Sequence, residues 1–478
     1  MTTEVKVEAQ KVDLFDKFKG LKWMVKLRSF QFLAILPNLV LFYIFILAGI
    51  FGSPIGNANI IIIFVWILWW FLLISVMVPF VGRLWCLMCP LPAFGDWLQR
   101  LTLIGVRPGK TVGLNNKLFG LNKRWPKALS NIWLQNIGFL TLATISILLV
   151  TRPIVSAVVL GGMALLATVM ALIWRGRAFC LYLCPVSGFL GLYSMTSMME
   201  LRSKDKEICR KVCKTKSCRA GSDRGWACPW LVYMGNLDRN NFCGLCMECV
   251  KSCPHDNITL YWRPFCSDKV IKGYDEAWKA FIMLVLAMAY SVVLLGPWGF
   301  LKDWANISEK GDVVGFIIYA ATLWFICLLG FPAIYYIAVK LGHWWAKAKK
   351  QNGAVSVKDM FIRYSYTLVP LGLLAWVAFS LPLIMVNGSY ILSVLSDPLG
   401  RGWNLFGTAH ITWTPVYPEY ATYIQIALLL VGLYYGIQKG LEIARELWRD
   451  EEAAFRSMVP VTVLLVVVTI AFMKLFAG

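Results

Sequence analysis

The chain has 478 residues, of which 59% are hydrophobic and only 15% are charged. A typical soluble domain has about 25% charged residues, so this composition excludes a soluble enzyme, a disordered protein and a small disulfide-stabilised domain. The formal net charge is +21. No nucleic-acid recognition motif accompanies it, and the cytoplasmic loops of membrane proteins collect Lys and Arg. The sequence therefore predicts a polytopic membrane protein that does not bind nucleic acid.

Nine apolar stretches are long enough to cross a hydrocarbon core of about 30 Å. They are residues 31–51, 59–81, 132–151, 154–174, 277–297, 314–340, 364–387, 420–438 and 458–476. A polar segment, 202–266, separates the fourth stretch from the fifth. We expect an all-α membrane protein of about nine transmembrane helices, in four parts. These are a tail (1–30), a four-span domain (31–201), an inserted domain (202–266) and a five-span domain (267–478).

Basic residues alternate from one connecting loop to the next. The N-terminal tail carries Lys22 and Lys26 just before the first stretch, and the loop after the second stretch is also basic. The long 388–419 loop has the single basic residue Arg401. By the positive-inside rule, this pattern predicts a multi-pass protein of the cytoplasmic (inner) membrane. Its N-terminus and cysteine groups would lie in the cytoplasm and its C-terminus outside.

The inserted segment carries nine of the 14 cysteines, and eight of these form two groups. Its second half reads Cys243-x2-Cys246-x2-Cys249-x3-Cys253-Pro254, the iron–sulfur run of bacterial ferredoxins, in which the fourth cysteine binds the other cluster. The first half has a looser version that ends in Cys228-Pro229. We therefore expect two [4Fe–4S] clusters with crosswise ligands. One set is Cys209, Cys213, Cys218 and Cys253; the other is Cys243, Cys246, Cys249 and Cys228. A zinc site is the alternative, although zinc prefers two cysteine pairs.

A second cysteine pattern is repeated at the ends of two apolar stretches. Gly82-Arg83-Leu84-Trp85-Cys86-Leu87-Met88-Cys89-Pro90 matches Gly176-Arg177-Ala178-Phe179-Cys180-Leu181-Tyr182-Leu183-Cys184-Pro185. Each copy follows a pair of stretches in the same orientation, so an axis along the membrane normal would bring the four cysteines together. We expect Cys86, Cys89, Cys180 and Cys184 to bind a third iron centre, either iron–sulfur or mononuclear. Two redox-active dithiol pairs, or plain cysteines at helix ends, are the alternatives.

A short segment, 91–105, follows the first Cys-Pro pair and is expected to lie along the membrane interface. A site that oxidises a quinol needs a proton acceptor near a metal centre, and Asp96 is the candidate in this segment. The alternative is an ordinary interfacial carboxylate.

These cysteine motifs resemble those of the NapH/NosR-type membrane-bound 4Fe–4S (polyferredoxin) electron-transfer proteins, over residues of about 30–266. In that family, paired Cys-x3-Cys-Pro motifs end membrane helices, and a two-cluster ferredoxin follows on the cytoplasmic side. The first pair here has two intervening residues instead of three, and the last five stretches have no counterpart that we assign.

The resemblance implies a membrane subunit that passes electrons between the quinone pool and partner redox proteins of a respiratory complex. It leaves open whether the chain is a component of a quinol dehydrogenase or of a quinone reductase. Two other functions remain. One is an assembly factor that reduces metal or thiols while a respiratory metalloenzyme matures. The other is a membrane anchor of a larger respiratory complex.

Overall fold

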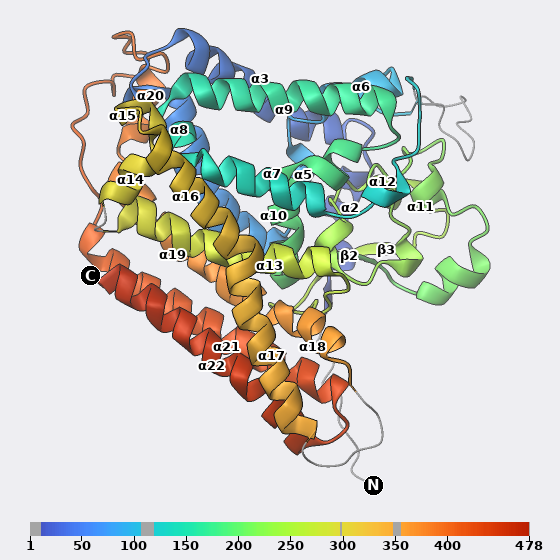
Figure 1. Ribbon diagram of the computed structural model, residues 1–478. Coiled ribbons are helices and arrows are strands. Elements are labelled where there is room, and N and C mark those ends of the chain that lie inside the picture. The colour runs from blue at the N-terminus through green and yellow to red at the C-terminus, as the bar shows by residue number, and fades with distance from the viewer. Residues whose placement is uncertain (1–10, 107–118, 297–298, 348–354, 478) are drawn as a thin grey trace.

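The computed structural model describes residues 11–106, 119–296, 299–347 and 355–477, and it is mostly helical (Figure 1). In this part of the chain, eight helical segments are long and apolar enough to cross a membrane. They are α3 (Phe30–Phe51), η2–α4–η3 (Ile62–Val81), α9 (Pro153–Ile173), α13 with η10 (Tyr274–Leu295), α16–η11–α17 (Val313–Lys347), α18–η12–α19 (Val357–Asn387), η13–α21 (Pro418–Leu447) and α22 (Glu451–Ala477). Each corresponds to a stretch predicted from the sequence.

The one remaining predicted stretch, 132–151, is the third in chain order. It forms two shorter helices, α7 (Trp133–Thr144) and α8 (Ser146–Thr151), separated at Ile145. At the start of α7, the Gln135 side chain donates hydrogen bonds to the backbone of the second Cys-Pro element. At the end of α8, the carbonyl oxygen of Thr151 lies 3.2 Å from where a Cβ on Gly56 would be. Gly56 is in the loop between the first two spans. Helices α7 and α8 together therefore extend from the cysteine end of the domain to its opposite end.

Shorter elements connect these spans. They are α1 (Leu14–Lys17), α2 (Lys19–Lys26), η1 (Gly56–Ala58), α5 (Trp85–Met88), α6 (Ala93–Arg100), η4 (Lys127–Leu129), η5 (Phe179–Leu183), α10 (Pro185–Tyr193), η6 (Ser194–Thr196), η7 (Ile208–Val212), α11 (Ser217–Ala220), η8 (Met234–Asn236), η9 (Asn240–Phe242), α12 (Glu248–Ser252), α14 (Gly299–Ala305), α15 (Ile307–Lys310) and α20 (Tyr390–Ser396).

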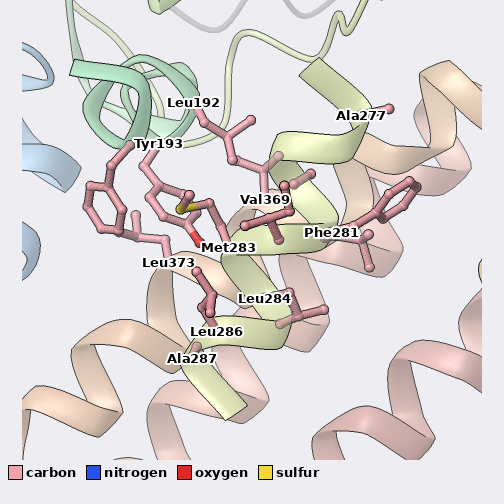
Figure 2. Close-up of a cluster of buried hydrophobic side chains, with 14 of the residues drawn as sticks. Leu192, Tyr193, Ala277, Phe281, Met283, Leu284, Leu286, Ala287, Val369 and Leu373 are labelled. Atoms are coloured by element: carbon pink, nitrogen blue, oxygen red, sulfur yellow. The ribbon is translucent and has the colours of Figure 1, made fainter. Parts of the chain in front are cut away.

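Helix α13 lies at the centre of the molecule. Nearly all its residues from Ala277 to Ala287 are buried, as expected of a helix that is hydrophobic on every side. Figure 2 shows Tyr193, at the end of α10, on one side of this helix and Val369 and Leu373 of α19 close to it. The first helix of the C-terminal half therefore packs directly against the cysteine-bearing half, and the two membrane domains share one core.

A small antiparallel sheet supports the inserted domain. Its strand order is β1 (Val12–Asp13), β3 (Ile258–Trp262), β2 (Met199–Ser203), with Val12 opposite Trp262 and Ser203 opposite Ile258. Residues 11–30 of the predicted tail thus pack on the inserted domain, and both Lys22 and Lys26 pair with Asp256. Residues 1–10 of that tail lie outside the described part of the chain.

Candidate metal centres

Each Cys-Pro element begins with a glycine that turns the chain at the end of a span. Gly82 has φ +61° and Gly176 has φ +67°, a region that side chains with a Cβ rarely adopt. The chain then enters a short helix that carries the first cysteine of the pair, Cys86 in α5 and Cys180 in η5, and both cysteines are buried. The repeat seen in the sequence is therefore also a repeat of backbone geometry.

The two Cys-Pro elements meet, and their four cysteines form one group, which we call the membrane-edge group (Cys86, Cys89, Cys180, Cys184). Cys180 interacts electrostatically with the other three thiols. Cys184 also accepts a hydrogen bond of 3.4 Å from the backbone N–H of Ser187. Burial raises the pKa of Cys184 to about 11. Because thiolates are the ligands, binding of iron by this group would release protons.

Two buried arginines, one from each repeat, tie the elements together. Arg177 donates from Nη1 to the carbonyl oxygen of Cys86 at 2.7 Å, and Arg83 donates from Nη2 to Ser187 Oγ at 2.5 Å. Each arginine therefore binds the opposite repeat, next to its cysteines. Arg83 also donates to the carbonyl oxygen of Asn241, just before the ferredoxin run, and lies over the ring of Trp230 at 4.2 Å. These bonds fix the repeats to each other and to the inserted domain.

Asp96, the candidate proton acceptor, is buried in an ion pair. Nε and Nη2 of Arg177 both donate to its Oδ2, at 3.0 and 2.7 Å, and Arg100 lies 3.7 Å from the same oxygen. Burial alone would raise the pKa of Asp96, but the positive charges of Arg177 and Arg100 outweigh it and lower this pKa below its usual value. The contacts therefore give Asp96 the role of a permanent counter-charge to Arg177, while its role as proton acceptor stays a prediction.

The first crosswise set of the inserted domain surrounds a small cavity. Cys209, Cys213, Cys218 and Cys253 all line it, and Cys218 interacts electrostatically with the other three. We call this set ferredoxin group one. Asn257 supports two of its sulfurs, donating from its backbone to Cys253 Sγ and from its side chain to Cys209 Sγ, each at 3.4 Å. Hydrogen bonds to sulfur of this kind are one means of tuning iron–sulfur clusters.

The second crosswise set also comes together. Cys249 interacts electrostatically with Cys246, Cys243 and Cys228, and we call these four residues ferredoxin group two. The structure therefore brings Cys228, from the irregular first half, to the regular run, and Cys253 to the first half. This is the arrangement expected from the Cys-Pro spacing of two-cluster ferredoxins.

The three groups follow one another through the molecule. Cys249 of group two interacts with Cys218 of group one, and Cys243 of group two interacts with Cys86 of the membrane-edge group. The charge of Arg177 acts on both Cys180 and Cys246, so this residue lies between group two and the membrane-edge group. Group two is thus the middle member of a series.

Mononuclear centres and [4Fe–4S] clusters require different spacings of their four sulfur ligands. In the described part of the chain, no three His, Cys, Asp or Glu side chains are placed to hold a single metal ion. One tetrahedral ion needs every sulfur at about 2.3 Å from the same atom. A [4Fe–4S] cube instead binds each thiolate to a different iron, which holds the four sulfurs further apart.

A cavity of about 340 Å³ opens beside the membrane-edge group, and all four cysteines of this group line the cavity. Its other walls are apolar and aromatic, with Trp69 and Trp85 from the first repeat, Phe139 from α7 and Trp376 from α19. Arg177 also lines it, whereas Asp96 is not among the lining residues. The volume and apolar walls are typical of a binding site for an apolar small molecule.

Sequence reasoning did not identify several residues around these groups. Arg83 and Arg177 belong to the repeated Cys-Pro motif, but the sequence alone assigns them no role. Trp376 belongs to a span to which no role was assigned. Lys279, at the edge of a predicted span, is buried close to the second Cys-Pro element. The signal for Lys279 was available, because a lysine within an apolar helix is costly and marks a functional position.

Comparison with known proteins gives one family. The family described as "4Fe-4S binding domain" matches residues 62–111 and again 156–205. The first match contains Cys86 and Cys89, and the second contains Cys180 and Cys184. No curated protein and no solved structure matches the chain. Over these two segments the chain is similar to 4Fe–4S binding domains, and this similarity supports iron–sulfur clusters in a mostly helical membrane protein.

Proposed function

We propose that this protein is a membrane electron-transfer subunit that connects a quinone with partner redox proteins. The observation that carries the proposal is the position of the membrane-edge group, between an apolar cavity and the two ferredoxin groups. Clusters bound by the three groups would supply one-electron transfer along this series. In this function the chain is a component of a quinol dehydrogenase or quinone reductase, as its resemblance to NapH/NosR-type proteins implies.

The residues fit such clusters. Each of the three groups offers four cysteines, and N–H groups donate to Cys184, Cys209 and Cys253. Arg83 and Arg177 place positive charge beside the membrane-edge group, which suits a cluster whose thiolates and sulfides carry negative charge. We propose [4Fe–4S] as the form of this third centre.

The cavity suits the ring and first isoprene units of a quinone. Its aromatic walls exclude water, and the Arg177 guanidinium lies at the cysteine end, where it is able to donate a hydrogen bond to a carbonyl or hydroxyl oxygen. Phe45, Leu160 and Met163 of α3 and α9 line the same cavity. Since these helices belong to the membrane domain, the cavity has apolar walls along which a lipid-soluble molecule would travel.

The far end of the series is at the protein surface. Cys213 and Cys253 of ferredoxin group one are partly exposed, and the neighbouring Lys211, Lys214 and Lys216 are exposed. We propose that an acidic redox partner binds this basic face. From the positive-inside pattern of the sequence, we also propose that the N-terminus and all three groups lie in the cytoplasm, and the C-terminus outside, in a cytoplasmic membrane.

The alternative of a thiol-reducing assembly factor receives less support. Such a function needs cysteines that reach a substrate disulfide or metal, whereas Cys86, Cys180 and Cys184 are buried. The other alternative is a membrane anchor of a larger complex. Such an anchor would need no cavity beside the cysteines, so the cavity gives it no support.

A substitution that fills the cavity tests the proposal. Met163 lines the cavity, while Leu165, two residues away on α9, is 67% exposed on its outer face. We expect Met163→Trp to slow cluster reduction by a short-chain benzoquinol about tenfold or more, the equivalent of ~1.4 kcal/mol of binding. Leu165→Trp should react like the wild type. The readout is the loss of visible absorbance of the oxidised clusters in the purified protein. Equal rates for all three proteins would refute a quinone site in this cavity.

A further inference from the structure

Lys279 of α13 is a cation enclosed within the protein. The residue is 1% exposed, and its Nζ makes a single long contact of 3.4 Å with Gln135 Oε1. It forms no ion pair with any carboxylate that the structure describes. Burial without a counter-charge disfavours the ammonium form of Lys279, and an anion close by would keep this side chain charged.

The nearest carboxylates are already engaged. Asp275 accepts a hydrogen bond from the backbone N–H of Ile132, and Glu276 forms an ion pair with Arg239 at 2.7 Å. Both act on Lys279 only through longer-range electrostatic interaction, as does Cys184 of the membrane-edge group. The remaining source of negative charge near Lys279, once iron is bound, is therefore the membrane-edge group, beside which Arg83 and Arg177 also lie.

The surroundings of Lys279 connect it to the second Cys-Pro element. Gln135, its hydrogen-bond partner, donates from Nε2 to the carbonyl oxygens of Cys180 and Leu181, both at 2.9 Å. Gly188 of α10, the helix that begins directly after Cys184, lies beside both Lys279 and Gln135. A Cβ at Gly188 would clash with Lys279 Nζ, so a side chain there would displace the ammonium. Three elements, α7, α10 and α13, thus define the position of this charge.

We propose that Lys279 is a positioning residue, the fixed counter-charge that raises the reduction potential of the cluster held by Cys86, Cys89, Cys180 and Cys184. Reduction adds one negative charge to a cluster, and a nearby buried cation stabilises the reduced form more than the oxidised form. The effect is strong because the surroundings are apolar and screen little. The inference rests on the cluster assigned under the proposed function.

The test is a redox titration of the purified full-length protein, followed by electron paramagnetic resonance. Lys279→Met keeps the length and removes the charge. We expect the equilibrium constant for reduction of the membrane-edge cluster to fall about tenfold or more, which is a 59 mV lower midpoint for one electron. The control is Lys272→Met, seven residues earlier, whose side chain is 55% exposed and pairs with Asp238. This variant should leave the midpoint unchanged, because solvent screens the charge.

Lys279→Arg separates charge from packing. If Lys279→Met loses the cluster and Lys279→Arg keeps it, the counter-charge role is supported. If both variants lose it, or if Lys279→Met keeps the wild-type midpoint, the inference is wrong. A wild-type protein with only the two ferredoxin signals would instead refute the membrane-edge cluster itself, a failure of the proposed function that the titration distinguishes.

Discussion

Arg177 has several structural tasks near the cysteines. Through Asp96 it holds α6, through the Cys86 carbonyl it holds the first Cys-Pro element, and it also lines the cavity. Asp96 neutralises the buried guanidinium of Arg177 and so offsets the cost of burying its charge. Asp96, which the sequence suggests as a proton acceptor, therefore also has a structural role as the counter-charge of Arg177. These two roles predict different effects of substitution and of pH.

Asp96→Asn should destabilise the protein strongly. Asparagine keeps the shape of aspartate but leaves the Arg177 charge buried and unpaired, which we expect to cost about 3–5 kcal/mol. Thermal unfolding of the detergent-solubilised protein measures this. Asp238→Asn is the control, since the Asp238–Lys272 pair is exposed and should change stability by less than about 1 kcal/mol.

The pH dependence separates the two roles of Asp96. Its pKa lies below the ordinary value of 3.8, so its stabilising contribution is complete above that value and is lost only as the pH falls through the lower, folded-state pKa. The stability difference between wild type and Asp96→Asn should therefore be constant over about pH 6 to 9. A difference that changes within this range would show that Asp96 titrates there, as a proton acceptor would.

At the scale of elements, the glycine turns of the two repeats are equivalent in φ but not in surroundings. A Cβ at Gly176 would lie 2.6 Å from the backbone oxygen of Pro229, whereas at Gly82 it would meet the Ser197 hydroxyl at 2.7 Å. The Ser197 side chain is able to move at the cost of its hydrogen bonds with Ser194, Met199 and Asn240, whereas the carbonyl of Pro229 moves only with the chain. Pro229 follows Cys228, so the Gly176 contact also joins the second repeat to ferredoxin group two.

Gly176→Ala should therefore be more harmful than Gly82→Ala. Both variants bear the left-handed strain of about 1–2 kcal/mol, but only Gly176→Ala must also shift the chain beside Cys228. We expect it to lower the iron content, while Gly82→Ala keeps its iron and loses only stability. Gly162→Ala, on α9 with no atom within 4 Å of the added carbon, is the neutral control. Similar iron contents in the Gly176 and Gly82 variants would contradict the role given to the Pro229 contact.

Elements with a strong local pattern were predictable from the sequence. The apolar spans and the ferredoxin spacing arise from periodicity and cysteine order, which are local properties. Strand β1 has two residues and no readable pattern, and it exists only because β3 offers a free edge. The interruption at Ile145 and the wall contributed by Trp376 likewise depend on packing between distant segments. The convergence of the two Cys-Pro elements was expected from their repeat, but Arg83 and Arg177, which join them, required the structure.

At the scale of the whole molecule, the 388–419 loop divides into two parts. Near Arg401 it is attached to the loop between the first two spans: Ser53 donates to the carbonyl oxygen of Leu399, and Arg401 donates to that of Phe51, at 2.7 and 2.5 Å. Beyond this point, Leu405 and Phe406 are exposed, Phe406 at 71%. An exposed apolar segment in a long loop favours a partner-binding surface over a lid.

We therefore predict that Leu405→Ser/Phe406→Ser removes an extracytoplasmic partner from the complex purified from native membranes. The visible spectrum of the clusters should not change, since the loop does not contact the cysteine groups. Trp403→Ser, in the same exposed part of the loop, should weaken the same association. Retention of every partner by the double variant would contradict partner binding by this loop. The loop would then only cover the membrane domain.

Three cysteine groups, not two, are proposed to bind [4Fe–4S] clusters between the cavity and the surface. The decisive measurement is the content of iron and acid-labile sulfide per chain, in the anaerobically purified wild type and in Cys86→Ser/Cys180→Ser. We expect about twelve irons and twelve sulfides in the wild type and about eight of each in the variant, four per cluster. About eight of each in both proteins, or about nine irons with eight sulfides in the wild type, would contradict it.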